Sequence, residues 1–353
     1  MRTMPKLLIK LTPLEPYFFG GERIFEIDDG NKHYFIRSLD TPSQSTLFGA
    51  LRYIGIKNPK SNYEVSNEDK KNIGSNSFKL SYPNVNDFGK INHISPLYLF
   101  SEKDGFLIRT PFDHRVRCTC GIFSPMYTPF DKYSDIVQTG VGDRRFPLEF
   151  NAKHGIADSW LALKDRKIFT DLFESSTCIG IDKKNIDKAF FKKEYKNLKR
   201  SFCFAFFADV DEDFRYYQSK VYLGQGKSSF NVECKFVETE PDFPEDLLRK
   251  EMVYAQSDIY YTDDIQELFN SCFFVCVQTR DYKIFTDSYL RRNKDTDKVI
   301  KLIQAGSVFW PCNREVFIRN FEKGKHTKLA GFNKIVIGGN YNGNISFQNR
   351  MFD

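Results

Sequence analysis

The chain has 353 residues, a formal net charge of +6 and 41% hydrophobic residues. A chain of this length can bury a sizeable core without disulfide or metal crosslinks, and two domains are the usual expectation. Its 36 phenylalanines outnumber its leucines, and because aromatic residues favour strands, the composition argues against a Leu-packed helical bundle. An AT-rich genome would give the same excess, so its cause stays open.

The sequence holds no signal for a membrane, a metal or a cofactor. No run of about 18 apolar residues occurs, and the apolar part of the start is too short for a signal peptide. The eight cysteines lack regular or zinc-site spacing, so we expect reduced thiols in a cytoplasmic protein. The five histidines are dispersed, and no hydrolase or metal motif accompanies them.

The first elements are a strand and a capped helix. Residues 6–19 alternate loosely and predict a strand that Gly20-Gly21 ends. A Ser/Thr-Pro start at residues 41–43, followed by apolar residues at helical spacing up to Ile54, predicts an amphipathic helix. The hydroxyls in its first turn fit either simple capping or an anion site, and the sequence does not choose between them.

Two stretches in the first half lack a regular pattern. Residues 57–77 are polar and predict a loop, and short strand-like pieces follow between residues 78 and 110. Residues 111–175 are irregular, with scattered Pro and Gly and an Asp-Arg-Arg cluster at 143–145. We interpret them as an excursion from a regular core.

The positive charge is concentrated in one segment. Lys183–Arg200 holds eight Lys or Arg residues against Asp187 and Glu194, a balance of +6 that equals that of the whole chain. Phe190, Phe191 and Tyr195 lie among the lysines, which is the mixture that phosphate neutralisation and base stacking need. A solvated hairpin or helix face is the alternative.

The second half is rich in strands. The apolar run 201–207 predicts a buried strand, which forms a hairpin with the segment before it, and 230–236 alternates as a strand. We expect a helix near 263–270, strands at 272–277 and 304–310, and a glycine-bounded tail at 331–339. The sum is an α+β protein with few helices.

Two motifs contain residues suited to phosphate binding or RNA cleavage, but neither has a complete pattern. Gly224-Gln225-Gly226-Lys227-Ser228-Ser229 lacks the first glycine of a phosphate-binding P-loop and precedes a strand rather than a helix. Its composition still suits close approach of backbone and Lys to phosphate. His33 with Tyr34 would suffice for a metal-independent nuclease, although a lone histidine is more often structural.

Several separated segments resemble one family. The segment Glu15–Gly21, the helix from Ser43 to Arg52, the stretch Ile179–Asp182 leading to Phe191, and the loop 224–228 resemble RAMP-superfamily CRISPR proteins. Ala305-Gly306-Ser307-Val308-Phe309 is similar to the late part of the third subunit of the type III-B (Cmr) effector complex. The equivalent subunit of the type III-A (Csm) complex is the competing resemblance.

The resemblance implies two ferredoxin-like (RRM-like) modules, which we divide as residues 1–176 and 177–353, with a hairpin thumb expected within 111–175. It implies a non-catalytic subunit that binds the 5′ handle of the crRNA and joins the large polymerase/cyclase subunit to the backbone RAMP subunits. A ferredoxin-like sheet suits single-stranded RNA. The expected RNA-binding residues are Ser43, Gln44, Ser45, Arg52, Arg144, Arg145, Gly224, Gln225, Gly226, Lys227 and Ser228.

Two rival functions stay open at this point. The first is a RAMP endoribonuclease that processes guide precursors without metal, with His33 and Tyr34 in its site. The second is a protein-only adaptor whose basic segment meets an acidic partner.

Overall fold

The computed structural model describes residues 6–28, 31–59, 65–75, 78, 80, 88–113, 115–119, 122–126, 136–139, 142–145, 158–181, 190–224, 227–244, 247–248, 252–261, 263–283, 299–322 and 325–338. Most of its regular structure is β, and most strand pairs are antiparallel. Its helices are short: α1 (Gln44–Ile54), α2 (Asn67–Ile73), α3 (Ile265–Asn270), α4 (Arg314–Glu322) and α5 (Lys325–Leu329). The expected α+β class is confirmed. No helix in the described ranges has the length and apolar character that a membrane span requires.

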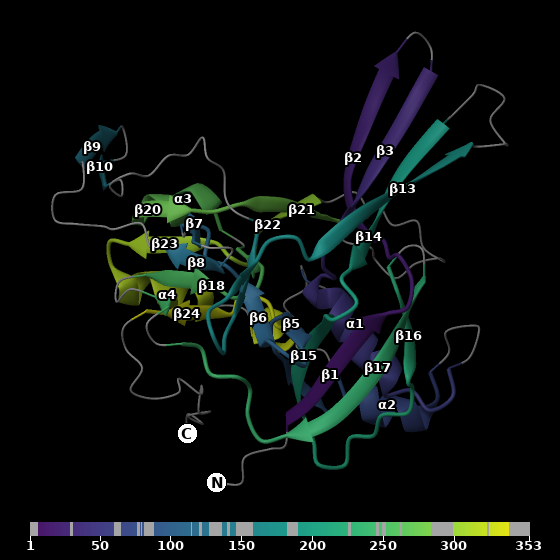
Figure 1. Ribbon diagram of the computed structural model, residues 1–353. Helices are drawn as coiled ribbons and strands as arrows, with labels where there is room; N and C mark the ends of the chain where they lie inside the picture. Colours follow the sequence, from purple (N-terminus) through teal and green to yellow (C-terminus); the bar gives the residue numbers. More distant parts are fainter. Residues whose placement is uncertain are drawn as a thin grey trace.

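A nine-stranded sheet forms the body of the molecule (Figure 1). Its order is β12 (Ile168–Phe169), β11 (Trp160–Ala162), β6 (Gly105–Arg109), β5 (Tyr98–Ser101), β15 (Cys203–Val210), β1 (Lys6–Pro13), β17 (Ser228–Val237) and β16 (Lys220–Leu223), with β4 (Ile91–Ile94) also pairing β15. The first strand, β1, pairs with β15 and β17, so the sheet joins strands from both sides of residue 176. The proposed boundary at 176/177 therefore does not separate two sheets, and the division into two modules stays a prediction.

Side-chain alternation along β1 separates two cores. Leu7, Ile9 and Leu11 lie in the cluster that contains the apolar face of α1, whereas Leu8 lies in a cluster with Tyr254 and Trp310 from the second half of the chain. Strand β15 is covered on both faces, which explains why its sequence is one continuous apolar run rather than an alternating one.

Aromatic rings fill these cores. The largest fully buried side chains of the described residues are all Tyr or Phe, and Tyr17, Phe19, Phe204 and Phe230 form one group with ring centroids 4.8–6.2 Å apart. Edge-to-face and tilted pairs at this spacing stabilise the fold beyond their buried area. The phenylalanine excess is thus used in packing.

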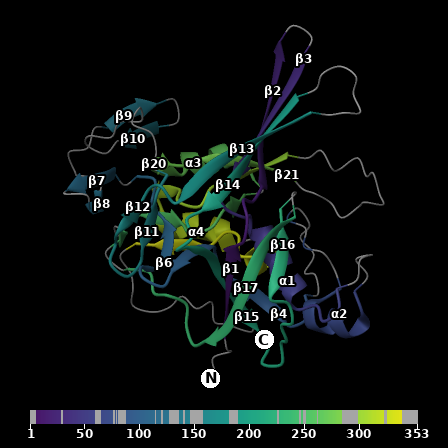
Figure 2. The ribbon, with the colours of Figure 1, turned by 45° about the vertical axis from the view of Figure 1, so that its right-hand side comes forward.

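A second sheet projects from the body. It contains β13 (Phe173–Ile181), β14 (Phe190–Leu198), β3 (Asn31–Leu39) and β2 (Phe19–Asp28), in that order. Figures 1 and 2 show its two hairpins standing out from the nine-stranded sheet. The basic segment does form a hairpin, because β13 pairs with β14 antiparallel, and residues 182–189 lie outside the described residues. The expected hairpin partner was wrong: the strand at 201–207 belongs to β15, which pairs with β1, β4 and β5 rather than with β14.

Two smaller sheets form the C-terminal part. One contains β20 (Cys272–Cys276), β23 (Val308–Pro311), β18 (Val253–Ala255) and β24 (Ile335–Ile337), and the other contains β19 (Ile259–Tyr260), β22 (Val299–Ile303) and β21 (Thr279–Lys283). The strand expected from residue 304 begins only at Val308, because residues 304–307 form a turn. Gly306 has φ +100° there, and an added Cβ would lie 2.5 Å from the Phe112 ring.

The two irregular stretches contain more structure than expected. Residues 57–77 include α2, because Ser66 caps Asn67–Ile73 and Ile73 is buried. Residues 111–175 include the hairpins of β7 (Arg115–Thr119) with β8 (Ile122–Met126) and β9 (Ile136–Thr139) with β10 (Gly142–Arg145). The thumb expected within 111–175 stays a prediction.

Candidate functional site

A cavity of about 280 Å³ lies where three parts of the chain meet. Residues 38–42 and Gln44, from the end of β3 to the start of α1, form one wall. Arg109 at the end of β6 and Trp160 at the start of β11 belong to the second wall. The third comes from the C-terminal sheets and their loops: Gln256, Ser257, Asp258, Gln278, Arg280, Gln304 and Ala305. The cavity therefore spans the junction between the nine-stranded sheet and the C-terminal part.

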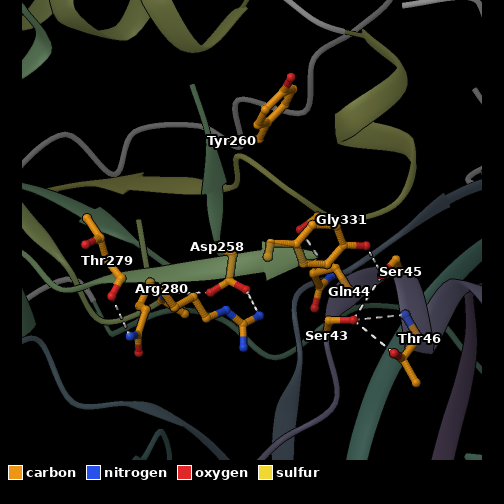
Figure 3. Close-up of polar contacts among 12 residues, drawn as sticks. Ser43, Gln44, Ser45, Thr46, Asp258, Tyr260, Thr279, Arg280 and Gly331 are labelled. Carbon is orange, nitrogen blue, oxygen red and sulfur yellow. Dashed lines mark hydrogen bonds and ion pairs between the residues drawn. The ribbon is translucent and has the colours of Figure 1, made fainter. Parts of the chain in front are cut away.

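Two ion pairs line this cavity. Arg280 pairs with Asp258, as Figure 3 shows, and Arg109 pairs with Asp158. The second carboxylate oxygen of Asp258 accepts a hydrogen bond from the Ala305 backbone N–H at 3.1 Å. Burial lowers the pKa of Arg109. Because the guanidinium groups are balanced by carboxylates, the cavity is polar without being strongly cationic.

Several donors at the cavity are not used within the protein. In the described part of the chain, the buried Trp160 Nε1 and Arg280 Nε have no hydrogen-bond partner, and both residues line the cavity. The Gln256 amide, by contrast, donates to the Tyr98 hydroxyl at 2.8 Å. A buried donor without a partner is costly.

The first turn of α1 borders this cavity, and its expected RNA-binding residues have distinct local roles. Ser43 is the N-cap, and its Oγ accepts from the Thr46 N–H at 3.3 Å. The Gln44 side chain is buried and donates to the carbonyls of Ser95 at 3.0 Å and Gly331 at 3.1 Å, and Figure 3 shows the latter bond.

The other two expected residues of α1 bind neighbouring elements. Ser45 Oγ lies 2.6 Å from the Tyr282 hydroxyl of β21. Arg52 donates to the carbonyls of Ile73 at 3.0 Å and Gly74 at 3.2 Å, at the end of α2. The capping interpretation is thus confirmed for Ser43, and the guanidinium of Arg52 is engaged at the opposite end of the helix from the cavity.

The glycine-rich loop forms the turn between β16 and β17. Gly224 has φ +74°, and an added Cβ would lie 2.0 Å from the Phe18 carbonyl oxygen. Ser228 Oγ donates to the Pro16 carbonyl at 3.2 Å, and Lys227 is exposed with φ +51°. The structure thereby brings together two segments that resembled the family, 15–21 and 224–228. Gln225 and Gly226 lie outside the described residues.

For the remaining site residues predicted from the sequence, the structure describes the backbone but not the side chains. Arg144 and Arg145 lie on β10, and His33 and Tyr34 lie on β3, where His33 is opposite Glu26 of β2. The positions of these side chains lie outside the described part of the structure. Among the residues described, no group of three or more His, Cys, Asp or Glu side chains is arranged to hold a metal ion.

Sequence reasoning missed most of the cavity. Arg109, Trp160, Gln256 and Arg280 are isolated residues, and they belong to no spacing motif. Two signals were available: the resemblance at Ala305, which lines the cavity, and the hydroxyl-rich start of α1, whose Gln44 lines it.

Comparison with known proteins identifies the family. The sequence matches the CRISPR-associated protein family Cas_Cmr3 over residues 9–340. The chain belongs to this family. The resemblance to the third subunit of the Cmr complex is therefore confirmed. A comparison with curated proteins found no significant match.

Solved structures support the fold of this Cas_Cmr3 protein. A chain in a cryo-EM structure of the type III-B Cmr-beta complex bound to cognate target RNA matches with a TM-score of 0.53 and 16% identity, over 94% of this chain and 96% of that one. The same complex with target RNA and AMPPnP gives 0.52, with the same identity and coverage. A type III-A Csm3–Csm4 subcomplex gives 0.36, with 11% identity over 86% of this chain and 92% of that one.

Proposed function

We propose that this Cas_Cmr3 protein is a non-catalytic subunit of a type III-B effector complex that holds the 5′ handle of the crRNA. In that role it would join the large polymerase/cyclase subunit to the backbone RAMP subunits through two ferredoxin-like modules. The family match over residues 9–340 and the fold shared with a Cmr-beta chain support the proposal. The antiparallel sheets and short helices agree with such modules.

The observation that carries the proposal is the cavity at the start of α1. Its volume of about 280 Å³ suits one nucleobase rather than a longer piece of RNA, because pockets for drug-sized ligands begin at about 300 Å³. Its lining contains side chains that can bind the edges of a base: the amides of Gln278 and Gln304, although Gln304 Nε2 also donates to the Thr279 carbonyl at 3.4 Å, and the residues Trp160 and Arg280.

Charge for the phosphates would come from outside the cavity. Lys227 is exposed next to Ser228, and the charge cluster of Arg144 and Arg145 lies on β10. Phosphate contacts fix the register of an RNA strand, whereas contacts to bases give sequence preference. In this division Ser43 and Ser45 would hold the wall of the cavity, and the base would be recognised by the glutamines.

The proposal is tested by fluorescence anisotropy with labelled handle RNA and a scrambled RNA of equal length. We expect the full chain to bind the handle more tightly. We expect Gln278→Ala to weaken handle binding roughly two- to tenfold, because it removes one hydrogen-bonding group from the cavity. Gln266→Ala on α3 is the matched control, since that exposed amide bonds only Asn270 among the described residues.

Two outcomes would contradict the proposal. Equal affinity for handle and scrambled RNA would remove the handle as the ligand. Site-specific cleavage of repeat RNA without metal, lost in His33→Ala, would replace the scaffold with an endoribonuclease.

A further inference from the structure

The projecting sheet has one face on which two cations lie close to the same aromatic ring. Strands β14 and β3 are parallel neighbours, and Lys192 is opposite Phe35 in their register. Arg37 follows Phe35 by two residues, so all three side chains lie on the same side of the sheet. We call Phe35, Arg37 and Lys192, with the neighbouring Ile179, the ring–cation face.

The contacts within this face are direct. Lys192 Nζ lies 5.0 Å from the centroid of the Phe35 ring, and Arg37 Cζ lies 5.2 Å from it. Both cations are exposed, and Phe35 is half-buried. On the adjacent strand Ile179 is opposite Lys192 and is 69% exposed, the most exposed of the large hydrophobic side chains described.

Glu194, the acidic side chain described on this side of β14, is already engaged. Glu194 accepts from Ser175 at 3.1 Å and pairs with Lys196 at 3.0 Å. Burial would raise the pKa of Glu194, but Lys196 and Ser175 hold it below its usual value. Lys196 also pairs with Asp40 at 3.1 Å, so this one ammonium faces two carboxylates. Three cations, Arg37, Lys192 and Lys196, thus stand against the carboxylates of Glu194 and Asp40, and these described charges leave one net positive charge.

On the opposite side of β14, Lys193 packs over two rings. Lys193 lies 3.9 Å from the centroid of the Phe18 ring and 4.9 Å from that of Tyr195. Phe18 is fully buried, so Lys193 covers a packed ring rather than an accessible one. The two sides of β14 thus differ: Lys193 is half-buried over the buried Phe18 ring, whereas Lys192 is exposed beside the half-buried Phe35.

We propose that the ring–cation face binds single-stranded RNA, with one base stacked on Phe35 and the adjoining phosphates on Arg37 and Lys192. The proposal rests on the proposed function for the identity of the ligand, and adds a contact outside the cavity. Positive charge beside a half-buried ring complements the phosphates and bases of a single strand. An exposed cation–π contact is weaker than a base stacked on an aromatic side chain, so the base displaces the cations toward the phosphates.

The position of the face agrees with a continuous RNA path. Strand β3 ends at Leu39, and the next residue, Asp40, lines the cavity and pairs with Lys196 of β14. The foot of the projecting sheet is therefore a wall of the cavity. A strand with one base in the cavity and the next nucleotides along β3 would meet Arg37 and then Phe35.

The experiment measures RNA affinity of the full chain by fluorescence anisotropy across a salt titration, with handle and scrambled single-stranded RNA. We expect Phe35→Leu to weaken binding of both RNAs about fivefold or more, through loss of stacking. We expect Arg37→Gln with Lys192→Gln to lower the slope of log K against log salt by about 1.4, since each phosphate contact to a single strand contributes about 0.7.

The control is Lys220→Gln with Tyr222→Leu, because these residues also lie two apart on one side of an exposed strand, β16, with Tyr222 57% exposed. The control should keep the wild-type affinity and slope. Thermal unfolding of each variant shows that the fold is kept.

Each outcome bears on one proposal or both. Unchanged affinity and slope in the Phe35 and Arg37/Lys192 variants, with a wild-type protein that prefers the handle, would overturn the ring–cation face alone. Equal wild-type binding to handle and scrambled RNA, lost in these variants, would overturn the handle and support the face. A wild-type chain that binds neither RNA would overturn both.

Discussion

The amide of Gln44 joins three distant parts of the chain, so its removal should destabilise the whole protein. Its Nε2 donates to the carbonyls of Ser95 and Gly331, and the residue is only 4% exposed. Ser95 follows β4, and Gly331 follows α5, so one side chain holds the N-terminal helix to both. The substitution Gln44→Ala leaves both carbonyls without this donor.

The magnitude follows from these two bonds. Each buried acceptor left without its donor costs about 1–3 kcal/mol. Gln44 also lines the cavity, through which water can reach part of the site, and this lowers the total. We expect Gln44→Ala to reduce the free energy of unfolding by about 2–4 kcal/mol. Ser45→Ala, which removes the partly buried contact with Tyr282, should cost about 1 kcal/mol or less.

Urea unfolding followed by tryptophan fluorescence measures both variants against the wild type. The reasoning predicts a clearly lower midpoint for Gln44→Ala than for Ser45→Ala at equal slope. If the two variants unfold at the same midpoint, the amide does not hold these segments together, and Gln44 is released for a direct role in RNA binding.

Three further predictions concern other parts of the fold. Gly224→Ala should reduce the free energy of unfolding by more than about 2 kcal/mol, because φ is +74° and the added Cβ meets the Phe18 carbonyl. Gly20→Ala should cost less, because its added Cβ has nothing within 4 Å. Urea midpoints that fall in the opposite order would contradict this. Burial would raise the pKa of Asp209, but hydrogen bonds from His93 and Lys6 hold it at about 2. The wild type should therefore have a higher free energy of unfolding than Asp209→Asn above about pH 4, and this difference should be lost as the pH falls through about 2. A difference in free energy that does not change with pH would refute this assignment. Lys227→Glu should weaken handle binding and flatten its salt dependence, and an unchanged anisotropy titration would remove this residue from the RNA path.

Local sequence patterns were sufficient to predict those elements whose structure depends mainly on their own residues. The Ser/Thr-Pro start and apolar spacing predicted α1 and its Ser43 cap, and the continuous apolar run predicted β15. The sequence also contained the signal for α2, since Ser66 followed by Glu68 and Asp69 is a typical helix start, although we had interpreted this polar stretch as a loop.

The cavity could not be predicted in the same way. Arg109 and Arg280 are 171 positions apart and meet only because β6 and β21 reach the same junction. No sequence motif surrounds either arginine, and each forms an ion pair with a carboxylate from another loop, Arg109 with Asp158 and Arg280 with Asp258. Such a site depends on long-range strand order, which periodicity does not encode.

The central place of β1 has a consequence for synthesis of the protein. Lys6 pairs with Asp209, 203 residues later, and β17 on the other side of β1 is later still. At about 5–20 residues per second, the ribosome needs roughly 10–40 seconds to supply these partners. During that time Leu7, Leu8 and Ile9 lack both strands that bury them. We expect the sheet to close around β1 only after residue 237 has emerged.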